Sequence, residues 1–571
     1  TLTDDRLGTF RGAGFDAVED TTIDVVTVNA SAGAVAAVSG LLTFNIVSDV
    51  ARVQIGGDSA AEAAQVNTLV ADTVSDDDLA RIGGSGAADV AQDTILRAEV
   101  SNDIEAYTVG VAVGGGVSVG AASGNNLIDS TAEVALGFAT VAAARDVTAN
   151  ASVDTQLDSW VLGRGGGWVG VAGSVDVNII EPVARVAVRG SQVNAGGRVL
   201  LDSDVTNDIF NVAAGAAAGT VGVAGGFVVN VLQSTSEVLM AGLPNTGAAP
   251  GEPSVVRATV TADGDVSLTA DTTNTTEAYA ASAAGGLAGV ALAANVNLVK
   301  ATTRVDIGAG SWASAGRVLD SGAIATLSLQ ANEYTTITGL AGSVGAGAVG
   351  AGASLDYVNF AANTGIRIGS DAQLRATGSV TATVLARRTV TSTVGVAGIG
   401  IGGLSAALSV IEMGGLSTDG SSDRNSNLAR VQSSLSEDQD TGSASDEGRA
   451  SDLAGYAGGS DTRDRMVAAR QGVTVTGTPA IDDVGVSVGD RALVDARGNL
   501  TLSSLAELQV VQNVGSLAGG AVGISAAVGV VTVETDSAVR LGNDVQLRTD
   551  AAATLSASGL RTAARLTLYM P

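Results

Sequence analysis

Residues 171–191 read VAGSVDVNIIEPVARVAVRGS, and the pattern in this stretch decides the fold. A Gly/Ala/Val-rich run leads into Asn178, and seven positions later Arg185 precedes an apolar-x-apolar-Gly element. The same spacing recurs from Asn45 to Arg52, from Asn126 to Glu133, from Asn230 to Glu237 and from Asn297 to Arg304. Five matches at one spacing predict a repeat architecture.

Later units depart from this spacing. The unit that begins at Asn359 is one residue shorter and leads to Ile366, a seventh unit is interrupted, and the last has Val531 where the others have Asn. The chain of 571 residues therefore holds about eight units. Because they run nearly from end to end, we expect a single elongated body over residues 1–571 whose units stack on their neighbours.

The composition predicts how the core is built and which chemistry is excluded. Hydrophobic residues make up 46% of the chain, aromatic residues only 3%, and Gly numbers 76, so we expect a thin core of Val, Ala, Leu and Ile between closely spaced backbones. The counts of Cys and His are both 0. This removes disulfides, thiolate metal sites, the commonest general base and the commonest metal ligand.

The formal net charge of -29 disfavours nucleic acid and anionic membrane surfaces as partners and favours cations. Basic residues are nearly all Arg, with Lys300 as the single lysine, which fits either a surface adapted to a salty or Ca²⁺-containing medium or a GC-rich genome. The chain opens with Thr1 and shows no secretion signal, so we expect it to be processed or cut from a longer protein.

Strand patterns dominate because apolar residues alternate with small or polar ones, as in Val109–Val113. We expect one strand to end at the Asn, a second to carry the Arg/Glu-Val-x-Ile element, and a third to begin after a turn, as over Val193–Leu201. The spacing of 52 residues from Asn126 to Asn178 fits two or three small rungs or one wide rung. The predicted fold is an all-β solenoid in which inward Gly and Ala let the sheets approach closely.

Three stretches interrupt the repeat. Residues 58–95 carry Ala, Leu and acidic residues at helical spacing and predict a short helical excursion. Residues 242–254 form a Pro/Gly loop, and residues 414–472 form a long acidic loop rich in Ser, Gly and Asp. In solenoids such insertions often carry binding.

Three motif matches have plainer readings. Gly345–Gly350 matches the dinucleotide-binding glycine pattern but opens no helix, so we assign it to a Gly-rich strand. Leu243–Gly247 matches the pentapeptide that anchors proteins to Gram-positive cell walls, but no apolar span follows it and a turn is preferred. Thr389–Ile411 is uncharged and about long enough to cross a bilayer as a helix. Its glycines favour a buried strand, and insertion of such Gly/Ala/Val hairpins into membranes as β-structure is the alternative.

Charged residues suggest two arrangements. Residues 76–78 and 419–423 hold the best carboxylate clusters for Ca²⁺, but neither has EF-hand spacing, so solvated acidic loops are preferred and the metal ligands stay unknown. The alternating Arg/Glu position predicts an ion-pair ladder in which Glu133 lies near Arg185, and Glu237 near Arg185 or Arg304. As exposed pairs these would contribute about 0–1 kcal/mol each.

We expect no enzymatic activity, no catalytic residues and no bound cofactor. No unit clusters Asp, Glu, Arg and aromatic residues as a sugar cleft needs, and Trp160, Trp168 and Trp312 are scattered. Because many polysaccharide lyases and hydrolases are β-helices, a polysaccharide-binding or polysaccharide-cleaving protein is retained as an alternative.

Residues 171–191 and the stretch GGLAGVALAANVNLVKATTRVDIGAGS at 285–311 resemble the repeat units of filamentous-haemagglutinin-like and leukotoxin-type filamentous adhesins, which are large secreted surface proteins of Gram-negative bacteria. The resemblance covers nearly the whole chain. It implies a secreted, rod-like β-solenoid that displays adhesive or self-associating surfaces.

We therefore expect an extracellular structural protein, either an adhesin rod or a subunit of a surface filament or sheath. Its expected partners are copies of itself in a head-to-tail polymer, or a longer parent chain, together with cell-surface glycans. Nucleic acid and a transmembrane helix are not expected. The second alternative is a membrane-inserting β-rich toxin segment.

Overall fold

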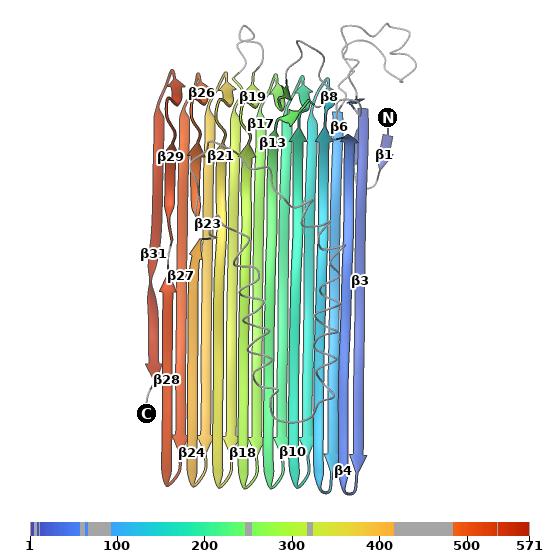
Figure 1. The fold of residues 1–571 in the computed structure, drawn as a ribbon, viewed down its shortest axis with the longest axis vertical. Helices are drawn as coiled ribbons and strands as arrows, with labels where there is room; N and C mark the ends of the chain where they lie inside the picture. Colours follow the sequence, from blue (N-terminus) through green and yellow to red (C-terminus); the bar gives the residue numbers. More distant parts are fainter. Residues whose placement is uncertain are drawn as a thin grey trace.

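A computed structural model describes residues 2–4, 8–10, 12–57, 63–66, 93–245, 254–316, 324–415, 483–533 and 535–569. Within these residues the chain contains strands and no helix, and it winds as a β-solenoid with three parallel sheets (Figure 1). The all-β solenoid class predicted from the sequence is confirmed.

Each turn of the solenoid, or rung, runs down one long strand, reverses in a tight turn, returns along a second long strand and closes through a short strand (Figure 1). The first long sheet holds β3 (Gly12–Gly33), β6 (Asp93–Gly114), β9 (Val147–Gly166), β12 (Val199–Ala218), β17 (Val266–Gly285), β20 (Leu327–Ala346), β23 (Val380–Ile399), β27 (Leu500–Gly519) and β31 (Ala553–Tyr569). The second long sheet holds β4 (Ala36–Gly56), β7 (Val117–Gly137), β10 (Val169–Arg189), β13 (Val221–Ala241), β18 (Ala288–Ile307), β21 (Val349–Ile368), β24 (Gly402–Gly415), β25 (Val484–Val488), β28 (Val522–Val533) and β29 (Ser537–Leu541).

The short sheet holds β5 (Ala64–Val66), β8 (Ala139–Ala143), β11 (Gln192–Ala195), β16 (Thr259–Ala262), β19 (Trp312–Ala315), β22 (Gln373–Ala376), β26 (Leu493–Ala496) and β30 (Gln546–Thr549). Two small antiparallel pairs lie outside the three sheets: β1 (Leu2–Asp4) with β2 (Gly8–Phe10), and β14 (Leu243–Pro244) with β15 (Val255–Val256).

One sequence repeat is one wide rung. The register places Asn178 of β10 between Asn126 of β7 and Asn230 of β13, so the 52-residue spacing advances the chain by a single strand position. The prediction of two strands on either side of the Asn is wrong, because Val169–Arg189 is one strand that passes through Asn178 without a break. The predicted third strand over Val193–Leu201 is also corrected: it comprises the short strand β11, a turn, and the start of β12.

The described body is a slab whose longest axis follows the long strands rather than the stacking direction (Figure 1). A strand of 21 residues such as β10 extends about 70 Å, whereas the nine stacked strands of the first long sheet span only about 40 Å. We call the edge with the tight turns between the long strands the tip, at the bottom of Figure 1, and the edge with the short strands the corner end.

Near the tip the two long sheets approach so closely that only glycine fits at some inward positions. A Cβ atom on Gly163 would lie 2.2 Å from the carbonyl oxygen of Gly173 on the facing strand, and one on Gly215 would lie 2.2 Å from that of Gly225. No side-chain atom is tolerated at such distances, so small inward residues set the sheet separation, as the sequence predicts.

The apolar core is divided along the strands. The corner end holds the largest cluster, built from all three sheets and represented by Val134, Val186, Val193 and Leu201. A second cluster with Ile128, Ile180 and Phe360 lies in the middle of the long strands, and small Ala clusters follow toward the tip. Buried polar residues separate these clusters.

The three predicted insertions fall mostly on residues outside the described ranges. Of 58–95, the described residues 64–66 and 93–95 are strand. Of 242–254, the described part contributes β14, and Asn245 donates its main-chain N–H to the Ser254 carbonyl at 2.8 Å. The described part of 414–472, residues 414–415, is the end of β24. Because β24 and β25 both pair with β21, the seventh rung is interrupted as predicted.

The Asn359 unit is corrected by one residue. Asn359 pairs with Leu298, and Val358 occupies the position of Asn297 in the register. A one-residue shift moves a side chain to the other face of a sheet, so Asn359 faces outward and donates to the Glu412 carboxylate at 3.1 Å. Val531 lies in the Asn column, as the sequence predicts, because it pairs with Ile411, which pairs with Val358.

We expect Gly163→Ala to destabilise the slab by about 1–3 kcal/mol, the range for overpacking, because its methyl group would collide with the facing strand. Gly173→Ala is the matched control, since a Cβ there meets nothing within 4 Å, and its change should stay within about 0.5 kcal/mol. Thermal unfolding followed by circular dichroism compares the two. Equal melting temperatures would contradict the close approach of the sheets.

Candidate functional site

The repeated Asn residues form a buried hydrogen-bonded ladder between the two long sheets. Asn45 donates to Asn126 at 2.7 Å, Asn126 to Asn178 at 2.6 Å, Asn178 to Asn230 at 3.0 Å, and Asn230 to Asn297 at 2.9 Å. The three inner amides, of Asn126, Asn178 and Asn230, both donate and accept along the stacking axis, so the ladder compensates the loss of water around these buried polar groups. It fixes the register, and its five side chains are almost completely buried.

A second polar column lies in the first long sheet and was not identified from the sequence. Asn207 donates to Asn274 at 2.8 Å, Asn274 to Ser234 at 3.0 Å, and Asn102 to Ser130 at 2.7 Å. The Thr/Asn-rich character of these segments was the available signal. The column could not be recognised as a repeat because its residue type changes from rung to rung. Thr155, for example, takes the position between Asn102 and Asn207.

The predicted Arg/Glu ladder forms, with Glu237 between Arg185 and Arg304 as expected. Its inner members are buried although exposed pairs were expected, whereas Arg52 at its end is exposed. Arg52 binds Glu133, Arg185 donates to Glu237 at 2.8 Å, and Arg304 donates to Glu237 at 2.8 Å. The Glu237 side chain is only 1% exposed and that of Arg185 8%. Burial alone would raise the pKa of Glu237, but the two guanidinium groups lower it to about 2.

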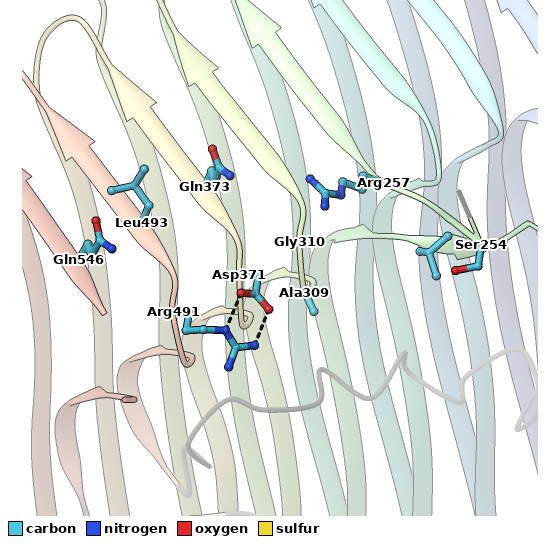
Figure 2. A pocket seen from close by; sticks show the side chains of 10 residues that line it. Ser254, Arg257, Ala309, Gly310, Asp371, Gln373, Arg491, Leu493 and Gln546 are labelled. Atoms are coloured by element: carbon cyan, nitrogen blue, oxygen red, sulfur yellow. Dashed lines mark hydrogen bonds and ion pairs between the residues drawn. The ribbon is translucent and has the colours of Figure 1, made fainter. Parts of the chain in front are cut away.

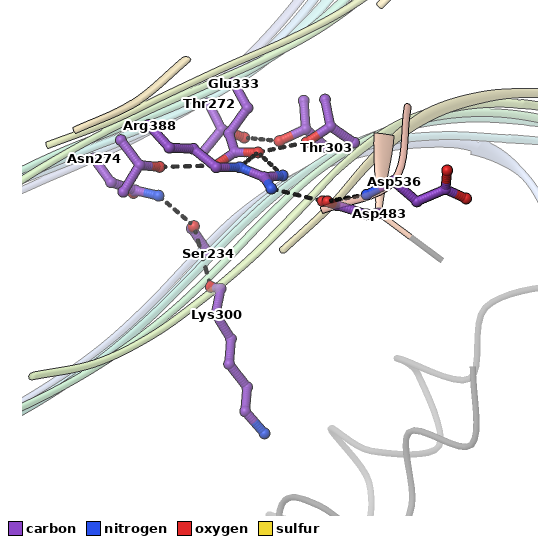
Figure 3. A network of polar contacts seen from close by, with 11 residues as sticks. Ser234, Thr272, Asn274, Lys300, Thr303, Glu333, Arg388, Asp483 and Asp536 are labelled. Atoms are coloured by element: carbon purple, nitrogen blue, oxygen red, sulfur yellow. Dashed lines mark hydrogen bonds and ion pairs between the residues drawn. The ribbon is translucent and has the colours of Figure 1, made fainter. Parts of the chain in front are cut away.

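The Arg/Glu ladder lacks a charged residue at Gly365, which pairs with Arg304. A separate buried cluster of charged residues lies near this position (Figure 3). Arg388 donates to Glu333 at 2.8 Å and to Asp483 at 2.6 Å, and Thr364 donates to Glu333 at 2.5 Å. Burial raises the pKa of the Asp483 carboxyl, while Arg388 opposes that shift. The cluster was not predicted, because its members come from β20, β23 and the residue before β25 and share no sequence spacing.

Two aspartates are buried on the tip side of the Asn ladder. Asp176 accepts hydrogen bonds from Ser159 at 2.9 Å and Asn178 at 3.2 Å, and Asp356 accepts from Asn295 at 2.9 Å. Neither carboxylate has an arginine or lysine partner in the described hydrogen bonds. Burial therefore raises the pKa of each to about 7.

The outer face of the first long sheet carries a row of carboxylates on β9, β12 and β17. Burial raises the pKa of Asp154, Asp158, Asp202 and Asp271, and that of Asp204 to about 6, with neighbouring carboxylates as a further cause for Asp204. Among the described residues no three such groups are placed to hold one metal ion. The predicted Ca²⁺ clusters at 76–78 and 419–423 lie outside the described residues.

A hollow of about 820 Å³ opens at the corner end (Figure 2). Arg491 binds Asp371 through two hydrogen bonds of 2.9 and 2.7 Å at its floor, and Gln373, Arg257 and Gln546 also line it. The Arg491 and Asp371 side chains are more than half exposed. These groups can form hydrogen bonds with a polar solute, but each lies on the open surface and nothing encloses a ligand among the described residues.

The other sequence motifs take structural positions. Gly345–Gly350 spans the tip turn between β20 and β21, so the prediction that it lies inside one strand is corrected: only its two ends are strand. Thr389–Ile411 is a strand–turn–strand segment of β23 and β24, which belong to different sheets, and its alternate residues are buried, so it is not one wholly buried strand. The tryptophans are separated: Trp160 lies on the face of β9, Trp168 at the tip and Trp312 at the corner end.

Comparison of the chain with protein-family models, with curated proteins and with solved structures finds no match. Among the described residues, no helix is long and apolar enough to span a membrane. The solenoid class therefore rests on the structure itself, and the resemblance to filamentous adhesins stays a prediction.

We expect Glu237→Gln to lower stability by about 3–5 kcal/mol at neutral pH, the usual cost of leaving buried partners of an ion pair unmatched. Glu507→Gln is the control, because the Arg387–Glu507 pair is exposed and should change stability by about 0–1 kcal/mol. Thermal unfolding measures both. Because the pKa of Glu237 is lowered in the fold, its contribution is complete above its unfolded pKa and is lost as the pH falls toward about 2; a difference between variant and wild type that did not shrink in acid would contradict this assignment.

We expect Asp176→Asn to reduce the pH dependence of stability. A carboxyl whose folded pKa is raised from 3.8 to about 7 binds more protons in the folded state, so it lowers stability as the pH rises between these values, by up to about 1.4 kcal/mol per pH unit. Melting temperatures from pH 4 to pH 8 should therefore fall less steeply for the variant. Parallel profiles for variant and wild type would show that Asp176 is ionised throughout.

Proposed function

We propose that this chain is a structural protein of the bacterial cell surface, a solenoid segment that provides length and display area and that grows by adding rungs at its ends. The observation that supports this proposal is the state of the two terminal rungs. β3 and β4 at one end, and β28 and β31 at the other, each pair with one neighbour among the described strands. Long unpaired edges of this kind are templates for further strands.

The gain from one added rung is large because it pairs two long strands at once. The internal pair β10 and β13 stays in register from Val169 to Arg189, and the pair β12 and β17 over the whole of β12. An incoming rung would meet equally long edges on β3 and β4. Rungs from a longer parent chain and rungs from a second copy both offer such edges.

The Asn ladder and the Arg/Glu ladder show which residues an added rung would need in order to match the β4 edge. Asn45 bonds only toward Asn126, and the Arg52 side chain, 46% exposed, bonds toward Glu133. A rung with Asn and an acidic residue in these two columns would extend both ladders. The opposite end presents Val531 and Ala538 there, so a second copy stacked head to tail is paired through its main chain but is mismatched at these two positions.

The double variant Val531→Asn/Ala538→Glu is therefore expected to stack head to tail more strongly than the wild type, because the new amide and carboxylate would face Asn45 and Arg52 of the next copy. Light scattering after size exclusion and negative-stain electron microscopy measure stack length at increasing concentration. Arg540→Glu, which adds negative charge outside these columns, is the matched control and should leave stacking unchanged.

Ala527→Pro tests the edge itself. Val522 donates its N–H to Ile401 of the preceding rung, and because main-chain groups alternate sides along a strand, that of Ala527 points to the free edge. Proline there removes one donor and obstructs an incoming strand, so stacks should disappear while the circular dichroism spectrum stays unchanged. If wild type and double variant both stay single slabs at every concentration, the proposal of growth by rung addition fails for copies of this chain.

A further inference from the structure

The segments at the tip, each made of the end of one long strand, the tight turn and the start of the next long strand, are uncharged in nearly every rung. Segments 25–48, 106–124, 159–175, 209–230, 278–296, 337–355, 390–411 and 510–531 together contain one charged residue, Arg164, although the chain has 59 acidic and 30 basic residues. In-register stacking brings all eight segments to one edge of the slab, at the bottom of Figure 1. The slab is therefore divided into a charged half and an uncharged half.

The uncharged edge exposes large apolar side chains on three sides. In the tight turns, Val35 is 79% exposed, Trp168 71%, Leu287 65% and Ile401 70%. Both outer faces beside the turns add exposed apolar residues: Val113, Val344, Ile399 and Leu517 on the first long sheet, and Val117, Leu292, Val349, Leu404 and Leu408 on the second. A contiguous apolar surface of this extent is rare on a protein that has no partner for it.

The depth of this surface is comparable with the apolar interior of a bilayer. Leu408 lies seven residues from Ile401, or about 23 Å along the strand, and the hydrocarbon core is about 30 Å thick. At that depth on the first long sheet, Tyr107, Trp160, Phe210 and Tyr279 form a row with ring centroids 5.4 to 6.5 Å apart. Aromatic rings are enriched at membrane interfaces. The charged residues Glu105 and Asp158 lie two residues from Tyr107 and Trp160 on the side away from the tip, with Asp158 level with Phe210 in the register.

The main chain at the tip is also suited to hydrocarbon, where unpaired polar groups are costly. The turns bond from rung to rung: Val169 donates to Gly116, Val221 to Trp168, and Val349 to Leu287, at 2.9 to 3.1 Å. Arg164 lies on β9 four residues from Trp160 toward the tip, about 13 Å deeper in the apolar layer, so it is the one charge in these segments whose burial opposes insertion. The terminal rungs have open edges, so we expect the inner rungs to make the contact.

We propose that the tip of the slab inserts into the hydrocarbon of a lipid bilayer, with the aromatic row at the interface and the charged half in water. A second copy is the competing occupant, but a flat partner would cover one face and leave the turn side chains of Trp168, Leu287 and Ile401 exposed. Only a fluid phase covers both faces and the edge together. The net charge of -29 favours a zwitterionic lipid surface over an anionic one.

The tryptophans allow a direct test with the full chain and phosphatidylcholine vesicles. One variant, Trp160→Phe/Trp312→Phe, keeps only Trp168 at the tip, and another, Trp160→Phe/Trp168→Phe, keeps only Trp312 at the corner end. On adding vesicles we expect the Trp168 emission to shift to shorter wavelength and to be quenched at least twofold when the acyl chains carry bromine. The Trp312 emission should stay unchanged.

Binding itself is measured by flotation with the same vesicles. Leu287→Asp/Ile401→Asp should reduce the floated fraction at least tenfold, whereas Ile324→Asp, which changes an 83% exposed isoleucine near the corner end, should leave it unchanged. No spectral shift and no flotation would overturn the proposal. A Trp168 shift that grows with protein concentration without lipid, and that bromine does not quench, would overturn it in favour of a second copy.

Stack length, measured by electron microscopy without lipid, tests rung addition independently of membrane insertion. Single slabs that still float would refute rung addition and leave insertion standing. Stacked slabs whose Trp168 is not quenched would refute insertion and leave rung addition standing.

Discussion

Parallel, in-register pairing between successive rungs is the constraint on which this structure depends. Each long strand lies beside a copy of its own pattern, so any residue type that recurs at one position becomes a column along the stacking axis. A residue type that recurs once per rung therefore forms a continuous row of contacting side chains. An isolated Asn in a core would be costly, but Asn126, Asn178 and Asn230 in one column satisfy one another.

The narrow separation of the sheets follows from the same repetition. Gly163 and Gly215 occupy the same inward position in successive rungs. A Cβ atom at either residue would collide with the carbonyl oxygen of the facing strand. The slab therefore gains little from large buried side chains near the tip and relies there on main-chain ladders and close packing. The larger core lies at the corner end, where the short sheet closes the rung and Val, Leu and Ile fill the wider space.

The charged and uncharged halves of the slab are the feature most relevant to function. Ionic contacts such as Arg388 with Glu333 and Asp483 lie away from the tip, in the same half as the acidic row on β9, β12 and β17. The eight segments at the tip contain one charged residue, Arg164. Growth at the open rung edges and insertion at the tip use different surfaces at right angles to each other, so one molecule could do both.

The sequence by itself determined the β-solenoid class, the unit of about 52 residues, the small inward residues and the Arg/Glu pairing, because each of these depends on local alternation and on spacing along the chain. It could not decide whether a unit is one wide rung or several, and it placed Asn359 in the ladder although Val358 lies there. The register is set by pairing over the whole strand, and a shift of one residue reverses the face.

Only the tertiary structure decided which charges are buried and which hairpins share an edge. Glu237 is enclosed between Arg185 and Arg304, and Glu333 meets Arg388 from another rung; neither burial nor that contact follows from spacing. Thr389–Ile411 was recognised as one uncharged segment, but eight such segments form a single apolar tip only because parallel stacking aligns every turn at the same edge.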